Sequence, residues 1–111
     1  MTTIAIFRTR MKPNVNMDEF SALHHRMNEI VTNMPGFVSV ELFRAEDGET
    51  LALAEFESLE ALDAWRDHPE HVVARQRGLE FFGDYNVKVC SLVREKKSAT
   101  AEPAKALSQR P

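Results

Sequence analysis

Cysteine and long hydrophobic runs are scarce in this chain of 111 residues. The single cysteine, Cys90, excludes an internal disulfide and cannot by itself form a zinc site. No apolar run approaches the roughly 18 residues that a membrane-spanning helix needs, and the amino terminus lacks the apolar core of a signal peptide. We therefore expect a cytoplasmic protein with no membrane partner.

An excess of basic residues is also missing. The formal net charge is −3, and the last sixteen residues carry four basic side chains and one acidic, so residues 1–95 hold ten basic and sixteen acidic side chains. Nonspecific nucleic-acid binding relies on cationic groups that displace counterions, so we expect no nucleic-acid partner. With 43% hydrophobic and 28% charged residues, the composition is typical of one soluble globular domain.

Alternating and helical patterns follow one another in an order typical of a split βαβ fold. Asp47-Gly48 is a hairpin signal between two alternating segments, and Pro69 interrupts the second helical segment because proline fits the first turn of a helix but not its interior. The predicted strands span residues 3–11, 37–45, 50–57 and 85–94, and the predicted helices run from the cap Asn16 to about Met34, over 59–67, and onward from Pro69. This order predicts an α+β fold with a four-stranded antiparallel sheet and its helices on one face.

Apolar side chains are expected on both faces of this sheet. Val38, Val40 and Leu42 form one row of the second strand, whereas Phe37, Phe43, Leu51 and Leu53 belong to the opposite face. Helices on one side cannot cover both faces, so we expect a homodimer in which a second copy of the chain covers the opposite face. The inward residues predicted for the second and third helices are Leu59, Leu62 and Trp65, followed by Val72, Val73, Leu79 and Phe82.

Residues 64–82, AWRDHPEHVVARQRGLEFF, concentrate the candidate functional side chains. They hold the single tryptophan, two of the four histidines and three arginines. The break at Pro69 places Trp65, His68 and His71 at a corner where backbone groups are free. Either Trp65 is a core residue beside solvated histidines, or the three side chains serve a site. The two histidines straddle Pro69, and the one adjacent candidate for a third ligand, Glu70, should point to solvent, so no metal site is predicted.

Three stretches resemble the antibiotic biosynthesis monooxygenase family of dimeric α+β barrel proteins. They are MPGFVSVELFRAEDG (Met34–Gly48), AWRDHPEH (Ala64–His71) and FGDYNVKVCSLVRE (Phe82–Glu95), and the likeness covers about residues 3–95. The resemblance implies a ferredoxin-like domain over residues 1–95, which pairs sheet to sheet with a second subunit and holds its own pocket between helices and sheet. Residues 96–111 have few large apolar groups, and we expect them to form a flexible tail.

The resemblance also implies a chemistry. Some members oxidise phenols or quinols with O₂ and use no metal or flavin, others degrade haem, and in both types the tryptophan at the end of the second helix lines the pocket. That residue is Trp65 here. The polyketide-oxidising type has an asparagine where this chain has Ala61, and the haem-degrading type has an asparagine and a histidine where this chain has Phe7 and Arg75.

Our leading hypothesis is a cofactor-independent monooxygenase that acts on a small aromatic phenol or quinol. Such a reaction needs a base to ionise the hydroxyl and a donor to stabilise an oxyanion or peroxide. The candidate catalytic residues are His71, Trp65 and His68, and the candidate substrate-binding residues are Phe7, His24 and Phe82; His24 is a second choice of base if it turns inward. The alternative is a non-catalytic dimer that binds a small aromatic or haem-like ligand.

Overall fold

The computed structural model describes residues 1–98, which form four strands and three helices. The strands are β1 (Thr3–Met11), β2 (Phe37–Arg44), β3 (Thr50–Phe56) and β4 (Phe82–Ser91), and the helices are α1 (Met17–Val31), α2 (Leu59–Arg66) and α3 (Pro69–Phe81). The sheet has the order β2-β3-β1-β4, and all neighbouring strands are antiparallel. The predicted ferredoxin-like α+β fold is confirmed. Residues 99–111 of the predicted tail lie outside the described residues.

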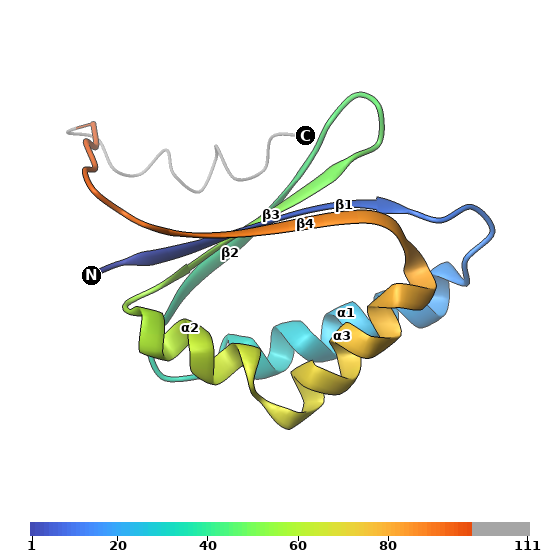
Figure 1. The fold of residues 1–111 in the computed structure, drawn as a ribbon, viewed down its shortest axis with the longest axis horizontal. Coiled ribbons are helices and arrows are strands. Elements are labelled where there is room, and N and C mark those ends of the chain that lie inside the picture. Colours follow the sequence, from blue (N-terminus) through green and yellow to red (C-terminus); the bar gives the residue numbers. More distant parts are fainter. Residues whose placement is uncertain (99–111) are drawn as a thin grey trace.

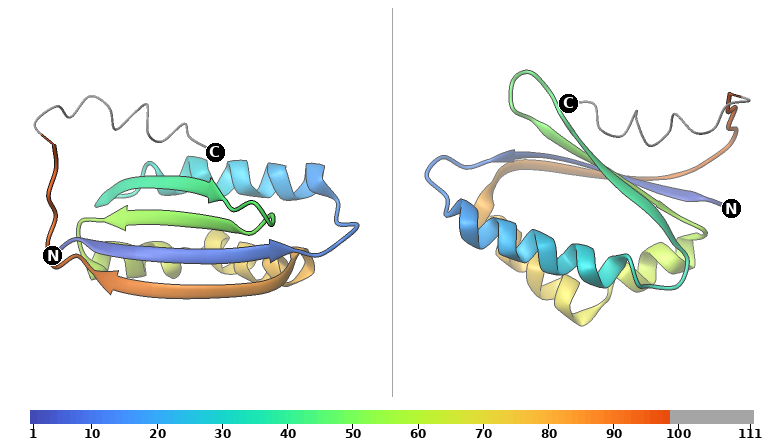
Figure 2. Two further views of the ribbon diagram at one scale, coloured as in Figure 1. Left: turned by 90° about the horizontal axis from the view of Figure 1, so that it is seen from above. Right: turned by 180° about the vertical axis from the view of Figure 1, so that it is seen from behind.

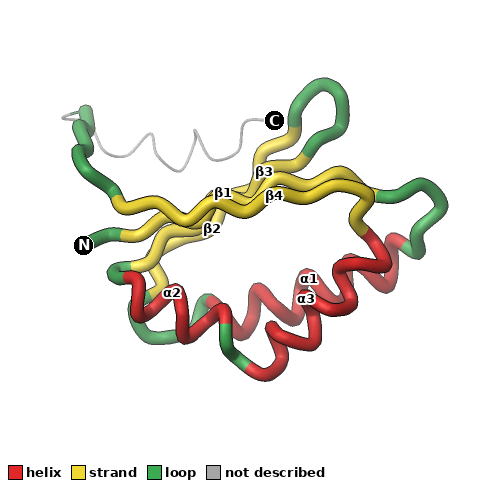
Figure 3. Tube along the Cα trace, viewed as in Figure 1, coloured by secondary structure: helices red, strands yellow, loops and turns green. Residues whose placement is uncertain are grey.

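The molecule has two layers, a sheet and a layer of helices that covers one side of it (Figure 1). Helix α1 lies beneath the β2–β3 half of the sheet, and α2 and α3 lie beneath the β1–β4 half (Figure 2). A short loop separates α2 from α3 (Figure 3). We call the uncovered side, which carries Ile6, Phe43 and Leu51, the open face of the sheet.

The covered side of the sheet holds the hydrophobic core. Val31 of α1, Phe56 of β3 and Leu62 of α2 are buried there together, and Phe56 is only 1% exposed. The partly buried side chains packed against them are Ala5, Phe37, Ala54, Ala61 and Trp65. Trp65 therefore packs against the core residues on the covered side of the sheet.

A β-bulge at the start of β2 corrects one prediction about the sheet faces. The pairing between β2 and β3 shifts between Phe37 and Ser39, so Val38 is the extra residue and the alternation reverses there. Phe37 consequently faces the helices, where its ring lies 5.8 Å from that of Phe56, and it does not share the open face with Phe43 as predicted. Val38, predicted to belong to the inward row, is 49% exposed.

The third helix buries small residues in place of the large ones that its sequence suggested. Val73 and Leu79 are 55% and 59% exposed, whereas Ala74, Gly78 and Phe81 are buried. A Cβ added at Gly78 would lie only 3.1 Å from the ring of Phe82, so the close approach of helix and strand depends on small side chains. The prediction that Val73 and Leu79 point inward is therefore wrong, and Leu59 of α2, which is 52% exposed, is a third such case.

Helix α1 ends at Val31, three residues before the predicted boundary, and a turn follows it. The turn is closed by hydrogen bonds from the backbone N–H of Asn33 and Met34 to the carbonyls of Ile30 and Val31. Gly36 then adopts a φ of +82°, and a Cβ at this position would lie 2.6 Å from the Cβ of Ala61 in α2. The loop before β2 can therefore pass directly against α2 only because residue 36 is glycine. Strand β4 begins at Phe82 and ends at Ser91, so both of its ends precede the predicted ones.

Candidate functional site

The break between α2 and α3 is built from side chains of the 64–82 segment that cap helix ends. The Nδ1 of His68 accepts a hydrogen bond from the backbone N–H of Glu70 at 3.2 Å, which caps the first turn of α3. Farther along α3, His71 Nδ1 lies 2.9 Å from the carbonyl oxygen of Trp65, and Arg75 Nη2 donates to the carbonyl oxygen of Arg66, also at 2.9 Å. Side chains from successive turns of α3 thus lie against the last carbonyls of α2, and the carbonyl of Trp65 also accepts the backbone N–H of His68 at 3.1 Å.

Two histidine rings lie close to the ring of Trp65. The His71 ring stacks on it with a centroid separation of 4.1 Å and an angle of 10° between planes, and the His68 ring lies 6.0 Å away at 45°. Because a carbonyl can only accept a hydrogen bond, Nδ1 of His71 carries the proton and Nε2 keeps its lone pair in the neutral ring. Burial lowers the pKa of His71 below its ordinary value, although the bond to Trp65 acts in the opposite direction. His71 is therefore neutral at pH 7.

A hollow of about 120 Å³ lies between α1, the sheet and Trp65, and we call it the Trp65 hollow. Its polar side chains are His24, Asn28 and the indole of Trp65, and its apolar lining consists of Met27, Val31, Phe37, Val40, Ala54 and Phe56. An apolar cavity with a few polar groups is the usual form of a small-molecule site. A single aromatic ring is the size of ligand that such a volume holds, since a cavity of about 150 Å³ binds benzene.

His24 and Asn28 supply the polar side of the hollow from α1. They are four residues apart, so they project from the same face of the helix one turn apart. His24 is exposed, but its ring stacks on that of Phe20 at 6.1 Å, and the resulting loss of solvent lowers its pKa, with a smaller effect of the same sign from His25. Within residues 1–98, neither His24 nor Asn28 has a side-chain hydrogen-bond partner, so both are available to a ligand.

The structure divides the six candidate residues among three places. Trp65 and His24 line the hollow, whereas His71 and His68 lie against the Trp65 ring without lining it. Phe7 and Phe82 were expected to bind the substrate, but they do not line the hollow. Their rings lie 5.6 Å apart in an aromatic cluster that also contains Phe20. Asn28 was missed by the sequence analysis. The signal that would have identified it is its spacing of four residues from His24 on a predicted helix.

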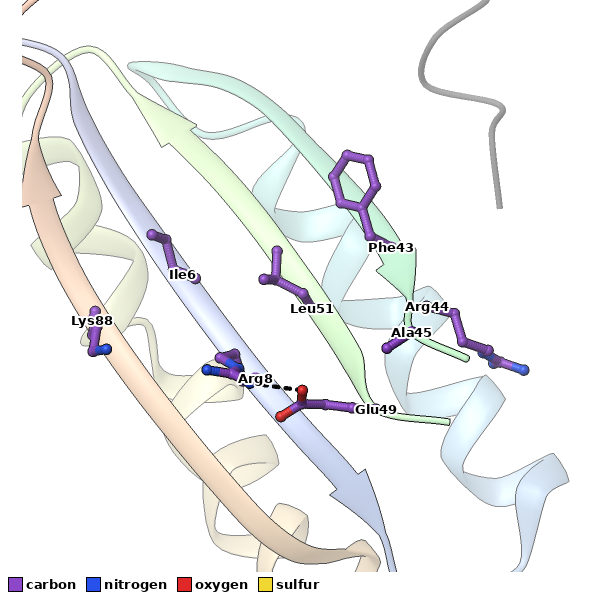
Figure 4. Close-up of a pocket in the computed structure, with 8 residues that line it drawn as sticks. All are labelled: Ile6, Arg8, Phe43, Arg44, Ala45, Glu49, Leu51 and Lys88. Carbon is purple, nitrogen blue, oxygen red and sulfur yellow. Dashed lines mark hydrogen bonds and ion pairs between the residues drawn. The ribbon is translucent and has the colours of Figure 1, made fainter. Parts of the chain in front are cut away.

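A second, larger hollow lies on the open face of the sheet, on the other side of the molecule from α1 and Trp65 (Figure 4). Its volume is about 410 Å³, and its lining residues are Ile6, Arg8, Phe43, Arg44, Ala45, Glu49, Leu51 and Lys88. Arg8 and Glu49 form an ion pair across it at 2.8 Å. This surface combines an apolar centre with charged margins, which is the pattern of an interface more than of an enclosed ligand site.

Comparison with known proteins connects this architecture to a family. The family model described as antibiotic biosynthesis monooxygenase matches residues 3–77. The chain belongs to this family. The resemblance noted from the sequence is thereby confirmed for the family, and the match includes α1, α2 and Trp65.

Individual relatives of this antibiotic biosynthesis monooxygenase family member agree with the assignment. The uncharacterized protein YqjZ of Bacillus subtilis is 32% identical over 72 residues, which cover 64% of this chain and 63% of that protein. The structure of Rv0793 from Mycobacterium tuberculosis superposes with a TM-score of 0.76 at 23% identity, covering 87% of this chain and all of the other. SnoaB, a cofactor-independent oxygenase from Streptomyces nogalater, has a TM-score of 0.72 at 16% identity, with coverages of 85% and 95%. These two structural similarities establish the fold.

Two further observations concern the described part of this family member. Within residues 1–98, no group of three or more His, Cys, Asp or Glu side chains is placed to hold a metal ion. None of the helices in that described part is long and apolar enough to cross a membrane. The polar side chains that line the Trp65 hollow are the imidazole of His24, the carboxamide of Asn28 and the indole of Trp65.

Proposed function

We propose that the protein is a cofactor-independent monooxygenase that oxidises a small aromatic phenol or quinol with O₂. The observation that carries the proposal is the Trp65 hollow, in which an aromatic face, an imidazole and a carboxamide surround a space of about 120 Å³. Membership of the monooxygenase family supports the reaction class. The similarity of SnoaB, a cofactor-independent oxygenase, is consistent with chemistry that needs no bound metal or flavin.

His24 is the base that we propose for this reaction. Its pKa is lowered, so it is neutral at pH 7 and able to accept the proton of a phenolic hydroxyl. The phenolate formed in this way is electron-rich enough to react directly with O₂, and the Asn28 carboxamide or the indole N–H can donate a hydrogen bond to the oxygen that gains charge. The face of Trp65 supplies the stacking surface for the ring.

His71 has a different role in this proposal, because it does not line the hollow. Its Nδ1 is committed to the carbonyl of Trp65, and its ring stacks on the indole at 4.1 Å. These two contacts fix the orientation of Trp65, so we assign His71 as a positioning residue. His68 caps the first turn of α3 and acts in the same way from the other side of the break.

The size of the hollow favours a substrate with a single ring. A haem or a fused multi-ring ligand is much larger than a space of about 120 Å³, so most of such a ligand would lie outside the Trp65 hollow. We therefore propose no haem and no other cofactor. Simple hydroquinones and monocyclic phenols are the compounds with which to begin.

Oxygen uptake with a hydroquinone series tests the proposal directly. We expect consumption of O₂ by the wild-type protein, a loss of about 10²-fold in turnover for His24→Ala, and no such loss for His25→Ala, a matched control on the same helix. The rate should also fall as the pH is lowered through the pKa of His24, because the protonated ring cannot act as a base. A protein that binds these compounds in the hollow without consuming O₂ would instead be the non-catalytic binder.

We also propose that the protein is a homodimer that buries the open face of the sheet. Phe43, Leu51 and Ile6 lie there without cover from the helices (Figure 4), and apolar side chains on an exposed sheet face favour association. Light scattering at micromolar concentration should give twice the mass of the chain. A monomeric mass would contradict the dimer without affecting the oxygenase proposal, because each subunit contains its own Trp65 hollow.

A further inference from the structure

Phe20 lies at the end of the molecule where α1 begins, α3 ends and β4 starts (Figure 1). Its ring contacts two rings from outside its own helix, that of Phe81 at a centroid separation of 5.4 Å and that of Phe82 at 5.8 Å. Both contacts are edge-to-face, with angles of 66° and 79° between the planes, which is a preferred geometry for aromatic pairs. The ring of Phe20 is therefore fixed by α3 and β4 as well as by α1.

The third ring beside Phe20 is the imidazole of His24, one turn farther along the same face of α1. The two rings stack at a centroid separation of 6.1 Å with an angle of 22° between their planes. Within residues 1–98, this stack is the only ring contact of His24, and its side chain forms no hydrogen bond or ion pair there. No polar partner in that part of the chain orients the imidazole, and Phe20 is the ring placed to do so.

The charges around His24 also leave Phe20 as the side chain that shapes its surroundings. Among the described residues that line the hollow, none is acidic, and β2, β3 and α2 present only apolar side chains and an indole to it. Burial lowers the pKa of His24, and the neighbouring His25 has a smaller effect of the same sign. Glu19, next to Phe20 in α1, is paired with Arg77 of α3. The Phe20 ring therefore keeps water from one side of the imidazole without bringing a charge to it.

We propose that Phe20 is the positioning residue of His24: its ring, fixed from α3 and β4, holds the imidazole at the edge of the hollow and keeps water from one side of it. This inference deepens the proposed function and rests on it for the catalytic consequence. The contact between the two rings does not depend on turnover, so it can be tested without a substrate. Phe20 does not line the hollow, so it acts on the chemical step and not on the binding of the substrate ring.

NMR spectroscopy of the imidazole protons tests the contact directly. In the wild-type protein, the ring current of Phe20 should displace the His24 resonances from ordinary histidine positions. In Phe20→Leu, which removes the ring and keeps an apolar side chain, this displacement should disappear. His24 should then titrate at a higher pH, because water regains access to the imidazole and favours its charged form. Phe20→Tyr keeps the ring, so it should retain both the displacement and the titration of the wild type.

Phe7→Leu is the matched control for the NMR comparison. Phe7 belongs to the same aromatic cluster, with its ring 5.6 Å from that of Phe82, but within residues 1–98 it has no ring contact with Phe20 or His24. The same loss of a ring should therefore disturb the cluster and leave the His24 resonances and titration unchanged. Circular dichroism confirms that each variant is folded. If Phe20→Leu unfolds, Phe20→Met replaces it, because a flexible apolar side chain fills an irregular space.

Oxygen uptake with a hydroquinone then measures the catalytic consequence. Phe20→Leu should lower kcat by about tenfold, because a base that is free to rotate spends less time in the reactive geometry, whereas KM should change little. The acid limb of the pH profile should move to higher pH together with the NMR titration of His24. Phe20→Tyr should restore both kcat and the pH profile.

The possible failures of these experiments are distinguishable. Unchanged His24 resonances and titration in folded Phe20→Leu would overturn the proposal. A loss of kcat without any change at His24 would also overturn it, because Phe20 would then act only through the core. An altered His24 with unaltered kcat and pH profile would instead refute His24 as the base. A wild-type protein that consumes no O₂ would refute the proposed function, while the NMR comparison would still decide whether Phe20 positions His24.

Discussion

At the scale of single residues, the 64–82 segment has a structural role in the same side chains to which we assign the proposed functional one. His71 and His68 cap helix ends through their Nδ1 atoms, which explains their positions on either side of Pro69 without any reference to catalysis. The same contacts place two imidazoles against the ring of Trp65, whose side chain lines the hollow. The choice between a packed corner and a site is therefore not exclusive, because the packing determines where the indole points.

Trp65→Phe separates the pocket role of this residue from its core role. We expect a stability loss of about 1–2 kcal/mol, typical of a partly buried position, together with a marked change in affinity for aromatic ligands, because the substitution removes the indole N–H and reshapes the hollow. Calorimetric titration with phenols and thermal unfolding measure the two effects. Leu62→Ala is the comparison for the stability measurement: it removes a buried core side chain that does not itself line the hollow, so it should cost about 2–5 kcal/mol. Unaltered affinity in folded Trp65→Phe protein would assign Trp65 to the core alone.

The lowered pKa of His71 predicts a dependence of stability on pH. Burial is the main cause of the shift, so on acidification the unfolded chain binds the proton before the folded protein does. The stabilising contribution is complete above the pKa of the unfolded chain and is lost as the pH falls through the lower pKa of the folded state. Thermal melting of the wild-type protein should therefore decrease more steeply from about pH 7.5 to about pH 5 than that of His71→Phe. His24 titrates in both proteins, so it cancels in this comparison, and identical slopes would contradict the assignment.

At the scale of secondary-structure elements, the contacts between α2 and its neighbours decide the geometry of the site. The loop before β2 reaches α2 at Gly36, and α3 reaches it through His71 and Arg75. Each contact depends on a feature of the backbone, a positive φ in the first case and the accepting carbonyls at the end of α2 in the second. Displacement of α2 would move Trp65 directly, so these contacts support the hollow from outside.

Gly36→Ala should disturb this arrangement strongly. The new Cβ would be strained by the positive φ and would also collide with Ala61, at a separation of 2.6 Å. We expect destabilisation of about 2–4 kcal/mol, measured by urea unfolding. Gly48→Ala provides the matched control, because Gly48 has a φ of +91° but no atom within 4 Å of its added Cβ; its cost should be about 1 kcal/mol, from the backbone conformation alone. Equal costs for the two substitutions would show that the contact with Ala61 is relaxed without penalty.

At the scale of the whole molecule, the sheet separates two surfaces of different chemistry. The covered side holds the core and the Trp65 hollow, whereas the open face carries Ile6, Phe43 and Leu51 between charged side chains such as Lys88. Among the described residues beyond β4, only Leu92 is partly buried, and residues 93–98 are exposed. Strand β4 ends at Ser91, and the backbone N–H of Leu92 donates one more hydrogen bond, to the carbonyl of Thr2 at 2.9 Å.

Removal of the residues after Lys96 should therefore leave the domain unchanged. We expect the melting temperature of the truncated protein to stay within about 1 °C of the full-length value, because no hydrogen bond of the sheet or the helices is removed. Differential scanning calorimetry of both proteins at equal concentration provides the measurement. A decrease of several degrees would mean that residues 97–111 dock on the domain.

The sequence by itself determined the order of the elements, the hairpin at Asp47-Gly48 and the break at Pro69. These features depend on local chemistry: capping side chains, turn residues and the missing N–H of proline act within a few positions of the chain. The family could also be recognised from short stretches, since those stretches contain the loop at Gly36 and the corner at Trp65.

Only the tertiary structure decided which side chains meet. The bulge at Val38 turns Phe37 toward the helices, and the close approach of α3 favours Ala74 and Gly78 over Val73 and Leu79. In both cases contacts between distant segments override a local periodicity. The site follows the same rule: Asn28 and His24 of α1 come to lie beside Trp65 only when α1 and α2 pack on the same side of the sheet. Local periodicity does not specify how close α1 and α2 lie to each other, because this distance is set by how the buried side chains between the two helices and the sheet fill space.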